Sequence, residues 1–400
     1  MFFLKTIIYK IFSFFLCNLT IMIVLALKKI IIIRFGDLET RAIGHFGLGT
    51  EIYLSEQKIL SKKKIFYDIW IKDKKVANYF LLKKLKEKIK IFPHHFKDVY
   101  KFFKKKSKLF KAHLIPMRHP DDYSDRWPKV THQMRDVNSV LGRTKCNIEF
   151  SSEENRLGNL LLKKLNIKNN FIIFFSRDST YRDKKLITSA PRNSSILLQK
   201  KSIKRMSKNY FCIRMGSKTE FELKIKSKNF LDYSFSKYRS EFNDLFLVSN
   251  CKFLVSTGSG FDHLAILFRK PVVLVNAVET EYRYNPLYNS SIKIFIPKKI
   301  YSKKLERLLT FSEIFKIGAH NLQTGEDYEK RSLFVIDNDE EEILQTVIEM
   351  DNLISNKIEY TKSEENLQKK YWDLNKLPNM PKFSCRIGTY FLKKNIELLK

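Results

Sequence analysis

The chain has 400 residues, 44% of them hydrophobic, and carries a formal net charge of +33. This length and composition exclude a disordered or fibrous protein and indicate about two to three globular domains. The positive charge favours anionic partners such as a phosphorylated ligand or an anionic membrane surface, whereas the lack of zinc-finger, basic-zipper and RNP-type motifs argues against nucleic acid as a partner.

The amino-terminal segment Ile11–Leu27, IFSFFLCNLTIMIVLAL, contains no charged residue and has lysines on both sides. It is at the lower length limit for a helix that spans a bilayer, and no signal-peptide cleavage site follows it. Three interpretations stay open: a short anchor helix, an interfacial helix on an anionic leaflet, and a core helix. We favour membrane attachment of residues 1–28. The five cysteines are odd in number and show no C-x-x-C spacing, which favours a reducing compartment and hence the cytoplasmic face of the cell membrane.

Residues 29–165 are predicted to form a first α/β domain. A buried strand runs through Lys29–Phe35, and Lys58–Lys111 alternates strand-like pieces with lysine-rich helical ones. Between them, His45 and Glu51 lie among small residues, where a ligand could approach the backbone closely. The following loop contains a possible metal cluster, but prolines break any helix and H-x-x-x-H spacing is missing, so we expect no metal site. The residues of that cluster are His119, Asp121, Asp122 and Asp125.

Residues 166–355 are predicted to form a second α/β domain, in which polar residues follow successive buried strands. Strands are expected at Phe171–Phe175, Tyr210–Ile213 and Phe230–Leu231. Because the carboxyl ends of parallel strands share one edge of a sheet, where ligands bind, this pattern predicts an anion or nucleotide site. Arginines suit a pyrophosphate, since guanidinium groups pair with phosphate oxygens and stay charged; the alternative is pairing with a neighbouring carboxylate. The residues assigned to this site are Arg177, Asp178, Tyr181, Asn193, Arg214, Gly216 and Asp232.

The stretch Leu247–Asn276 predicts a βαβ unit that completes this site. Its loop places two glycines and three hydroxyl groups between the carboxyl end of a strand and the amino end of a helix. Free N–H groups and the helix dipole attract anions at such a place. The loop is neither a Walker loop nor a complete G-x-G-x-x-G, so a tight turn without a ligand is the alternative. We assign Ser256, Thr257, Gly258, Ser259, Gly260 and Asn276 to the site.

The pattern is looser in the carboxyl-terminal part of the chain. A helix is predicted at Lys299–Leu309, and a second one follows the cap Asp337–Asp339. The acidic run at this cap is expected from the helix dipole and needs no metal. Residues 356–400 are predicted to be a helical tail that packs back on the fold.

The chain contains, in this order, the phrases IGHFGLGTEIYL, FFSRDSTYRD, APRNSS, CIRMGS, LDYSFSKYRSEFNDLFLVSNCKFLVSTGSGFD and RKPVVLVN. Together they resemble a family of bacterial glycosyltransferases from surface-polysaccharide gene clusters. The resemblance implies an α/β, GT-B-like fold of two Rossmann-like domains facing across a cleft, after an apolar N-terminal helix. The arginine that follows the strand is also similar to the H-x-R phrase of fucosyltransferases, but Phe175 and Ser176 stand where that family usually carries a histidine.

The resemblance implies that residues 29–165 bind a glycan or lipid-linked glycan acceptor and that residues 166–355 bind a nucleotide-sugar donor. It further implies sugar transfer without a metal or cofactor. Such a reaction must stabilise the leaving nucleoside diphosphate and deprotonate an acceptor hydroxyl. Because imidazole titrates near neutral pH, we favour His45 as the base, with Glu51 second. Asp232 and Asn276 are candidates for holding the ribose or the base of the nucleotide. The alternative is a non-catalytic nucleotide- or carbohydrate-binding protein of polysaccharide assembly.

Overall fold

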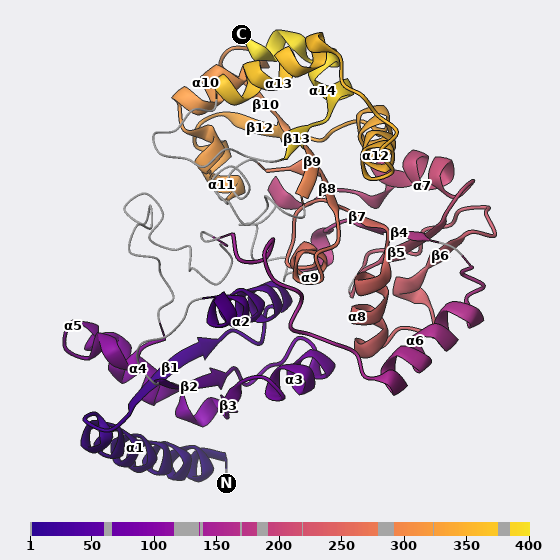
Figure 1. The fold of residues 1–400 in the computed structure, drawn as a ribbon. Coiled ribbons are helices and arrows are strands. Elements are labelled where there is room, and N and C mark those ends of the chain that lie inside the picture. Colours follow the sequence, from indigo (N-terminus) through magenta and orange to yellow (C-terminus); the bar gives the residue numbers. More distant parts are fainter. Residues whose placement is uncertain are drawn as a thin grey trace. The chain divides into compact units, whose positions relative to one another are not determined.

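The computed structural model describes most of the chain (Figure 1). The described residues are 2–59, 66–115, 136, 139–168, 170–181, 191–217, 219–278, 292–322, 324–374 and 385–400. The chain divides into two compact units, Met1–Glu149 and Phe150–Lys400. The division lies before the boundary expected at residue 165, because helix α6 (Ser152–Lys164) packs on α8 (Glu241–Asn250) of the second unit. A Cβ atom at Gly158 would lie 2.2 Å from the Phe246 ring, so glycine permits this close packing.

The first unit contains a three-stranded parallel sheet. Its order is β1 (Ile32–Leu38), β2 (Phe66–Lys72) and β3 (Lys90–Phe92). Arg34 and Asp68 are register partners in β1 and β2 and form a bidentate ion pair with N–O distances of 2.6 and 2.5 Å. The helices of this unit include α2 (Thr50–Ile59), α3 (Tyr79–Lys86), α4 (Lys97–Lys105) and α5 (Ser107–Phe110), and a π-helical turn, His45–Gly49, precedes α2.

The amino-terminal helix α1 (Phe2–Leu27) buries one face against α4. Cys17 and Val24 are 7% and 2% exposed and share an apolar cluster with Val99 and Phe103 of α4. Outside this face the helix is exposed: Phe12, Phe14, Phe15 and Met22 have exposed fractions of 62%, 67%, 67% and 68%. Within the described part of the chain, no helix combines the length and hydropathy that a bilayer crossing requires.

The second unit contains a seven-stranded sheet in which all neighbouring strands are parallel. From one edge to the other the strands are β13 (Arg386–Ile387), β9 (Ile292–Pro297), β8 (Val272–Ala277), β7 (Phe253–Ser256), β4 (Phe171–Phe175), β5 (Phe211–Met215) and β6 (Phe230–Asp232). Counted from β4 as the first strand, the run from β6 to β9 has the 3-2-1-4-5-6 order of a doubly wound Rossmann sheet. The prediction of a parallel α/β sheet is confirmed for this part of the chain.

Helices cover both faces of the seven-stranded sheet. Figure 1 shows α7 (Lys200–Met206) and α12 (Glu340–Ile354) on one side and α6, α8 and α9 (Asp262–Leu267) on the other. Every residue of β4, β7 and β8 is buried. These strands read as continuous apolar runs because they lie between two helical layers.

A small antiparallel sheet replaces the helix predicted at Lys299–Leu309. β10 (Lys299–Ser302) pairs with both β11 (Arg307–Leu308) and β12 (Leu333–Ile336). Alternate residues of β10 are buried, which is the period of a strand. Glu306 has a φ of 52° in the connection, a left-handed conformation that no helix accommodates. The helix prediction was wrong because burial alternates over only the four residues of β10 and because β12, the strand that pairs with β10, lies far along the chain.

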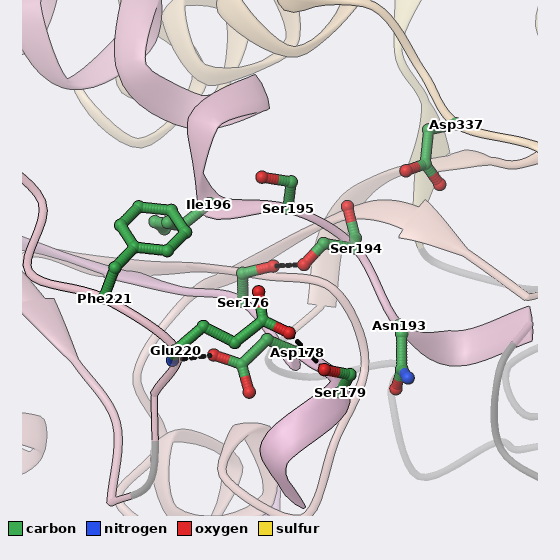
Figure 2. A pocket seen from close by; sticks show the side chains of 10 residues that line it. All are labelled: Ser176, Asp178, Ser179, Asn193, Ser194, Ser195, Ile196, Glu220, Phe221 and Asp337. Atoms are coloured by element: carbon green, nitrogen blue, oxygen red, sulfur yellow. Dashed lines mark hydrogen bonds between the residues drawn. The ribbon is translucent and has the colours of Figure 1, made fainter. Parts of the chain in front are cut away.

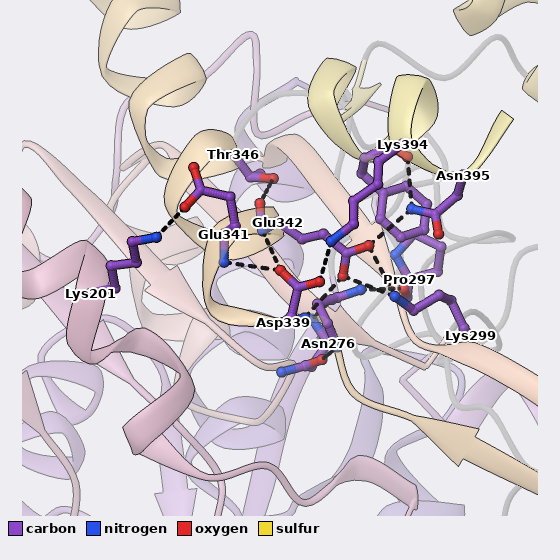
Figure 3. A network of polar contacts seen from close by, with 12 residues as sticks. Lys201, Asn276, Pro297, Lys299, Asp339, Glu341, Glu342, Thr346, Lys394 and Asn395 are labelled. Carbon is purple, nitrogen blue, oxygen red and sulfur yellow. Dashed lines mark hydrogen bonds and ion pairs between the residues drawn. The ribbon is translucent and has the colours of Figure 1, made fainter.

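The carboxylates at the start of α12 join the small sheet and the last helices (Figure 3). Asp339 accepts hydrogen bonds from the first N–H groups of α12 and pairs with Lys394. The buried Glu342 carboxylate accepts from Lys299 Nζ and Asn395 Nδ2, each at 2.9 Å. The acidic run therefore caps a helix and pairs with lysines. The remaining helices are α10 (Phe311–Lys316), α11 (Gly325–Glu329), α13 (Lys362–Leu374) and α14 (Thr389–Lys394).

Candidate functional site at the carboxyl edge of the large sheet

The seven-stranded sheet has a topological switch point between β4 and β7. From this pair the strand order continues to β5 and β6 on one side and to β8 and β9 on the other. The connections after these two strands leave in opposite directions, and the crevice outside their carboxyl ends is where open parallel sheets bind ligands. Ser176 and Arg177 follow β4 there, and Thr257 and Gly258 follow β7.

Hydrogen bonds join the two strand ends at the switch point. The Arg177 N–H donates to Thr257 Oγ1 at 3.0 Å, and the Arg177 carbonyl accepts from the Ser194 N–H at 2.8 Å. Ser176 Oγ donates to the Ser194 carbonyl at 2.6 Å. Three chain segments that are distant in sequence are therefore held together, with the predicted residues Arg177 and Thr257 in contact.

A pocket of about 280 Å³ lies beside the end of β4 (Figure 2). Hydroxyl, amide and carboxylate groups line it, and Ile196 and Phe221 add an apolar surface. Such a lining offers hydrogen-bond partners to a polyol and an apolar contact to a ring. The lining residues are Ser176, Asp178, Ser179, Asn193, Ser194, Ser195, Ile196, Glu220, Phe221 and Asp337, which include the predicted Asp178 and Asn193.

The loop after β5 forms one wall of this pocket. Asp178 accepts hydrogen bonds from the Glu220 N–H and, in its own turn, from the Thr180 N–H, each at 3.1 Å. Gly216 lies at the start of the loop, and a Cβ atom there would lie 2.6 Å from Thr219 Cγ2. Gly216 thus permits a tight turn. Asp178 ties the loop to the end of β4.

A buried lysine lies beside the pocket at the end of β9. Lys298 is 6% exposed; its Nζ donates to the Asn193 carbonyl at 2.7 Å and pairs with Asp337 Oδ1 at 2.6 Å. Burial lowers the pKa of Lys298, and the Asp337 carboxylate acts in the opposite direction. The Lys298 ammonium group thus contacts Asn193 and Asp337, two residues that line the pocket.

The loop Ser256–Gly260 folds around a carboxylate of its own chain. Asp262 is fully buried and accepts the Ser259 N–H at 2.6 Å and the Ser256 hydroxyl. Gly258 has a φ of 81°, a conformation that favours glycine. The Ser259 N–H, which a phosphate would need as a hydrogen-bond donor, is bonded to Asp262 instead. Helix α9 has only six residues, so its dipole is small. The loop is therefore an internally hydrogen-bonded turn and not the anion site expected at a helix start. The loop reaches the switch point through Thr257.

Arg214 and Asp232 bind each other. Both lie within their strands and not after them, and they are register partners in β5 and β6. Arg214 Nη1 lies 2.8 Å from Asp232 Oδ2 and donates to the Phe221 carbonyl at 3.1 Å. Burial raises the pKa of Asp232, whereas the Leu223 N–H and Arg214 lower it. Arg214 therefore pairs with a carboxylate of the same sheet, which was the alternative to binding a pyrophosphate. We no longer assign Arg214 or Asp232 to the binding of a nucleotide-sugar.

Asn276 is also a structural residue. It lies inside β8 with a φ of 51° and has no exposed surface. Its Nδ2 donates to Ser194 Oγ at 2.8 Å, its N–H donates to Asn338 Oδ1 at 2.7 Å, and its Oδ1 accepts from the Asn338 N–H. Both ends of the amide are engaged, so Asn276 positions Ser194 in place of holding a ligand.

The two candidate bases lie in the first unit and differ in exposure. The His45 side chain is 31% exposed, and its Nδ1 lies 3.6 Å from Glu39 Oε2. Glu51 is fully buried and accepts from the Asn147 N–H and from Asn147 Nδ2, both at 3.1 Å. Glu51 therefore fixes α2 to the segment around Asn147 and is withdrawn as a candidate base.

Several residues in the pocket or beside it were not predicted. Ser176 and Lys298 directly follow buried strands, so the rule that selected Arg177 would also have selected them. Ser194, Ser195, Glu220 and Asp337 come from irregular segments whose placement depends on tertiary contacts. The side chain of the predicted Tyr181 lies outside the described structure, as do His119, Asp121, Asp122 and Asp125. Among the described residues, no three His, Cys, Asp or Glu side chains are grouped so that they could hold a metal ion.

No family model and no curated protein sequence matches the chain. The fold is similar to the E. coli ADP-heptose LPS heptosyltransferase II, with a TM-score of 0.38 and 12% identity over 60% of this chain and 84% of that chain. For a family 9 glycosyltransferase from Veillonella parvula, the TM-score is 0.39 with 12% identity over 61% and 79%. For an E. coli heptosyltransferase with ADP, the TM-score is 0.33 with 10% identity over 60% and 86%. Similarity at this level decides neither family nor activity.

Proposed function

We propose that this protein is a glycosyltransferase that moves a sugar from a nucleotide-sugar donor to a surface-glycan acceptor. The observation that carries the proposal is the polar pocket at the switch point of a doubly wound parallel sheet, beside Ser176 and Asn193. Sheets of this order bind nucleotides at this place. The volume of about 280 Å³ is near the lower end of ligand pockets and suits a nucleoside or sugar group.

The pocket chemistry divides between two parts of the proposed donor. The Asp178 and Glu220 carboxylates accept hydrogen bonds from ribose or sugar hydroxyls, with Ser195 and Asn193 as neutral partners. We place the diphosphate toward Arg177, whose guanidinium charge would stabilise the leaving group without a metal. The sequence phrases that resemble bacterial glycosyltransferases support the same assignment.

For the acceptor hydroxyl we retain His45 as the proposed base. Imidazole accepts a proton near neutral pH. The Glu39 carboxylate, 3.6 Å from His45 Nδ1, would stabilise the imidazolium that forms. In this scheme the first unit supplies the base and binds a glycan or lipid-linked glycan, and the second unit binds the donor.

Substitution of Ser195→Trp is expected to abolish nucleotide binding, because the indole fills the pocket from an exposed position. In the unchanged protein, a nucleoside diphosphate at about 100 times its Kd should raise the free energy of unfolding by about 2.7 kcal/mol. Thermal unfolding with ADP, GDP and UDP in turn measures this stabilisation. The variant should show none of it.

Ser363→Trp is the matched control, since Ser363 is also exposed and makes one hydroxyl hydrogen bond, but lies in α13 and outside the pocket lining. It should keep the full nucleotide response. A Ser195→Trp protein that still responds would contradict the pocket assignment. Sugar transfer assayed with a nucleotide-sugar library then separates an enzyme from a non-catalytic binding protein of the same fold, which would bind the nucleotide and form no product.

We also propose that α1 lies in the plane of an anionic membrane surface. One face is packed on the first unit, so the exposed Phe12, Phe15 and Met22 form a separate apolar face. Lys28 and Lys29 follow the helix, and α4, against which it packs, carries exposed lysines. This combination is that of an interfacial helix, whose apolar face enters the headgroup region while lysines contact anionic lipids.

The triple variant Phe12→Ser, Phe15→Ser, Met22→Ser should lose at least ten times in affinity for phosphatidylglycerol vesicles, measured by co-sedimentation, because it removes the apolar contact and leaves the lysines. The triple variant Leu157→Ser, Leu160→Ser, Leu305→Ser removes side chains that are exposed in the second unit and should bind as before. Equal binding by both variants would show that charge alone holds the protein on vesicles.

A further inference from the structure

A second, larger groove lies at the opposite edge of the seven-stranded sheet. Its volume is about 800 Å³, and six lysines line it: Lys200, Lys204, Lys208, Lys224, Lys226 and Lys228. Lys208 comes just before β5, and the 224–228 segment comes just before β6. Both walls therefore meet the amino ends of these strands, whereas the proposed donor pocket is at the carboxyl ends.

The six lysines come from two chain segments, three on each wall of the groove. Lys200 and Lys204 are one turn apart on α7, about 6 Å along the axis, and Lys208 follows in the next turn. Lys224, Lys226 and Lys228 are exposed and alternate with the half-buried Ile225 and Ser227 in a segment that is neither helix nor strand. Each wall of the groove thus carries three lysine side chains.

The two walls are fixed to each other. Asn229 Nδ2 donates to the Ser207 carbonyl at 2.9 Å, and the Asn229 carbonyl accepts from the Cys212 N–H at 2.8 Å. In the described part of the chain, no hydrogen bond or ion pair engages any of the six ammonium groups. Five of the six lysines are exposed, and Lys200 is half-buried. The groove is therefore a preformed cationic channel whose charge is not neutralised by neighbouring carboxylates.

We infer that this groove binds a linear acidic polysaccharide, whose carboxylate or phosphate groups pair with the lysines on its two walls. No aromatic residue and no arginine is among its described lining residues, so it lacks the stacking surfaces with which proteins hold single-stranded nucleic acid. Ile225 is the one apolar residue among its described lining residues, and a concave groove is unsuited to a flat membrane. A flexible chain of charged sugars needs no stacking surface and can enter a concave groove.

Binding of a fluorescein-labelled oligogalacturonate to the full chain, followed by fluorescence anisotropy, tests this inference. The triple variant Lys224→Gln, Lys226→Gln, Lys228→Gln should bind at least ten times more weakly. The logarithm of its affinity should also depend less steeply on the logarithm of salt concentration, by about two to three ions. The triple variant Lys200→Gln, Lys204→Gln, Lys208→Gln on the other wall should show a similar loss.

The matched control is Lys163→Gln, Lys164→Gln, Lys168→Gln, which removes three exposed lysines of the same unit outside the groove. It should change the affinity less than twofold; an equal loss in this control would show that net charge alone attracts the glycan. Stronger competition by oligo-dT at equal charge, or loss of anionic-vesicle binding in the groove variants, would assign the groove to nucleic acid or membrane and overturn the inference. Stabilisation by nucleoside diphosphates should persist in both groove variants, so a failure here is distinct from a failure of the proposed transferase activity.

Discussion

Substitution of Arg214→Met is expected to lower the free energy of unfolding by about 3–5 kcal/mol, because it leaves the Asp232 carboxylate buried without its cation. The side chains of Arg214 and Asp232 are 2% and 4% exposed, so water cannot replace the lost partner. Methionine keeps most of the aliphatic volume and so limits any cavity. Urea denaturation of the variant and of the unchanged protein measures the difference.

The cost of Arg214→Met should shrink as the pH falls. Burial already raises the pKa of Asp232, and Arg214 is one of the groups that lower it. Without Arg214 the folded state takes up a proton at a higher pH than the unfolded state does. The folded state then binds more protons, and the variant's stability decreases as the pH rises through this range. Unfolding at about pH 5 and at about pH 8 should therefore show a smaller difference from the unchanged protein at the lower pH.

Two variants complete the test of this pair. Arg214→Met combined with Asp232→Leu should be more stable than Arg214→Met alone, since no unpaired charge stays buried. Arg156→Met breaks an ion pair with Glu153 at the surface of α6 and should leave the stability unchanged within error. If Arg214→Met is as stable as Arg156→Met, the buried pair does not hold β5 and β6 together.

Substitution of Asp262→Ala is expected to cost about 2–5 kcal/mol of unfolding free energy, because the Ser259 N–H and the Ser256 hydroxyl each lose a charged acceptor in a buried loop. The loop should also lose its shape, and with it the Thr257 contact to the Arg177 N–H. Nucleotide stabilisation should then decrease as well. Urea denaturation and thermal unfolding with ADP, GDP or UDP measure the two effects separately.

Asp262→Asn is the conservative comparison, since it keeps one acceptor oxygen and nearly the same volume. It should cost about half as much as Asp262→Ala. Adding Ser256→Ala to Asp262→Ala removes one of the orphaned donors, and the double variant should be no less stable than Asp262→Ala alone. A loop that tolerates Asp262→Ala without loss would show that the carboxylate is not what organises it.

Local patterns were sufficient for much of the second unit. The strand predicted at Phe171–Phe175 coincides with β4, and Asp339 of the predicted cap stands at the start of α12 and accepts hydrogen bonds from its first N–H groups. Each of these two signals is contained in a few consecutive residues of the chain. The predicted helix at Lys299–Leu309 was wrong, because β10 is stabilised by pairing with β12 and that pairing is not visible in the segment itself.

In the candidate site, too, local patterns predicted some features and missed those that depend on distant parts of the chain. The rule that polar residues follow buried strands brought Arg177, Asp178 and Thr257 to one edge, and the structure places them around the switch point. It could not show that Arg214 lies inside its strand and opposite Asp232. The predicted strand ended at Ile213, whereas β5 continues to Met215, and this shift of two residues changes the neighbours of Arg214. It also passed over Glu220 and Ser195, whose segments carry no periodic pattern.

By itself, the sequence determined the parallel α/β class of the second unit and the edge of its sheet where polar side chains gather, because both follow from the order of buried strands and the residues after them. Only the tertiary structure decided which of those polar groups are available to a ligand. Arg214, Asp232, Asn276 and Ser259 are engaged by partners that strand register and loop closure bring from elsewhere in the chain. A buried polar group takes the nearest partner of suitable charge, and the identity of that partner is a property of the folded chain.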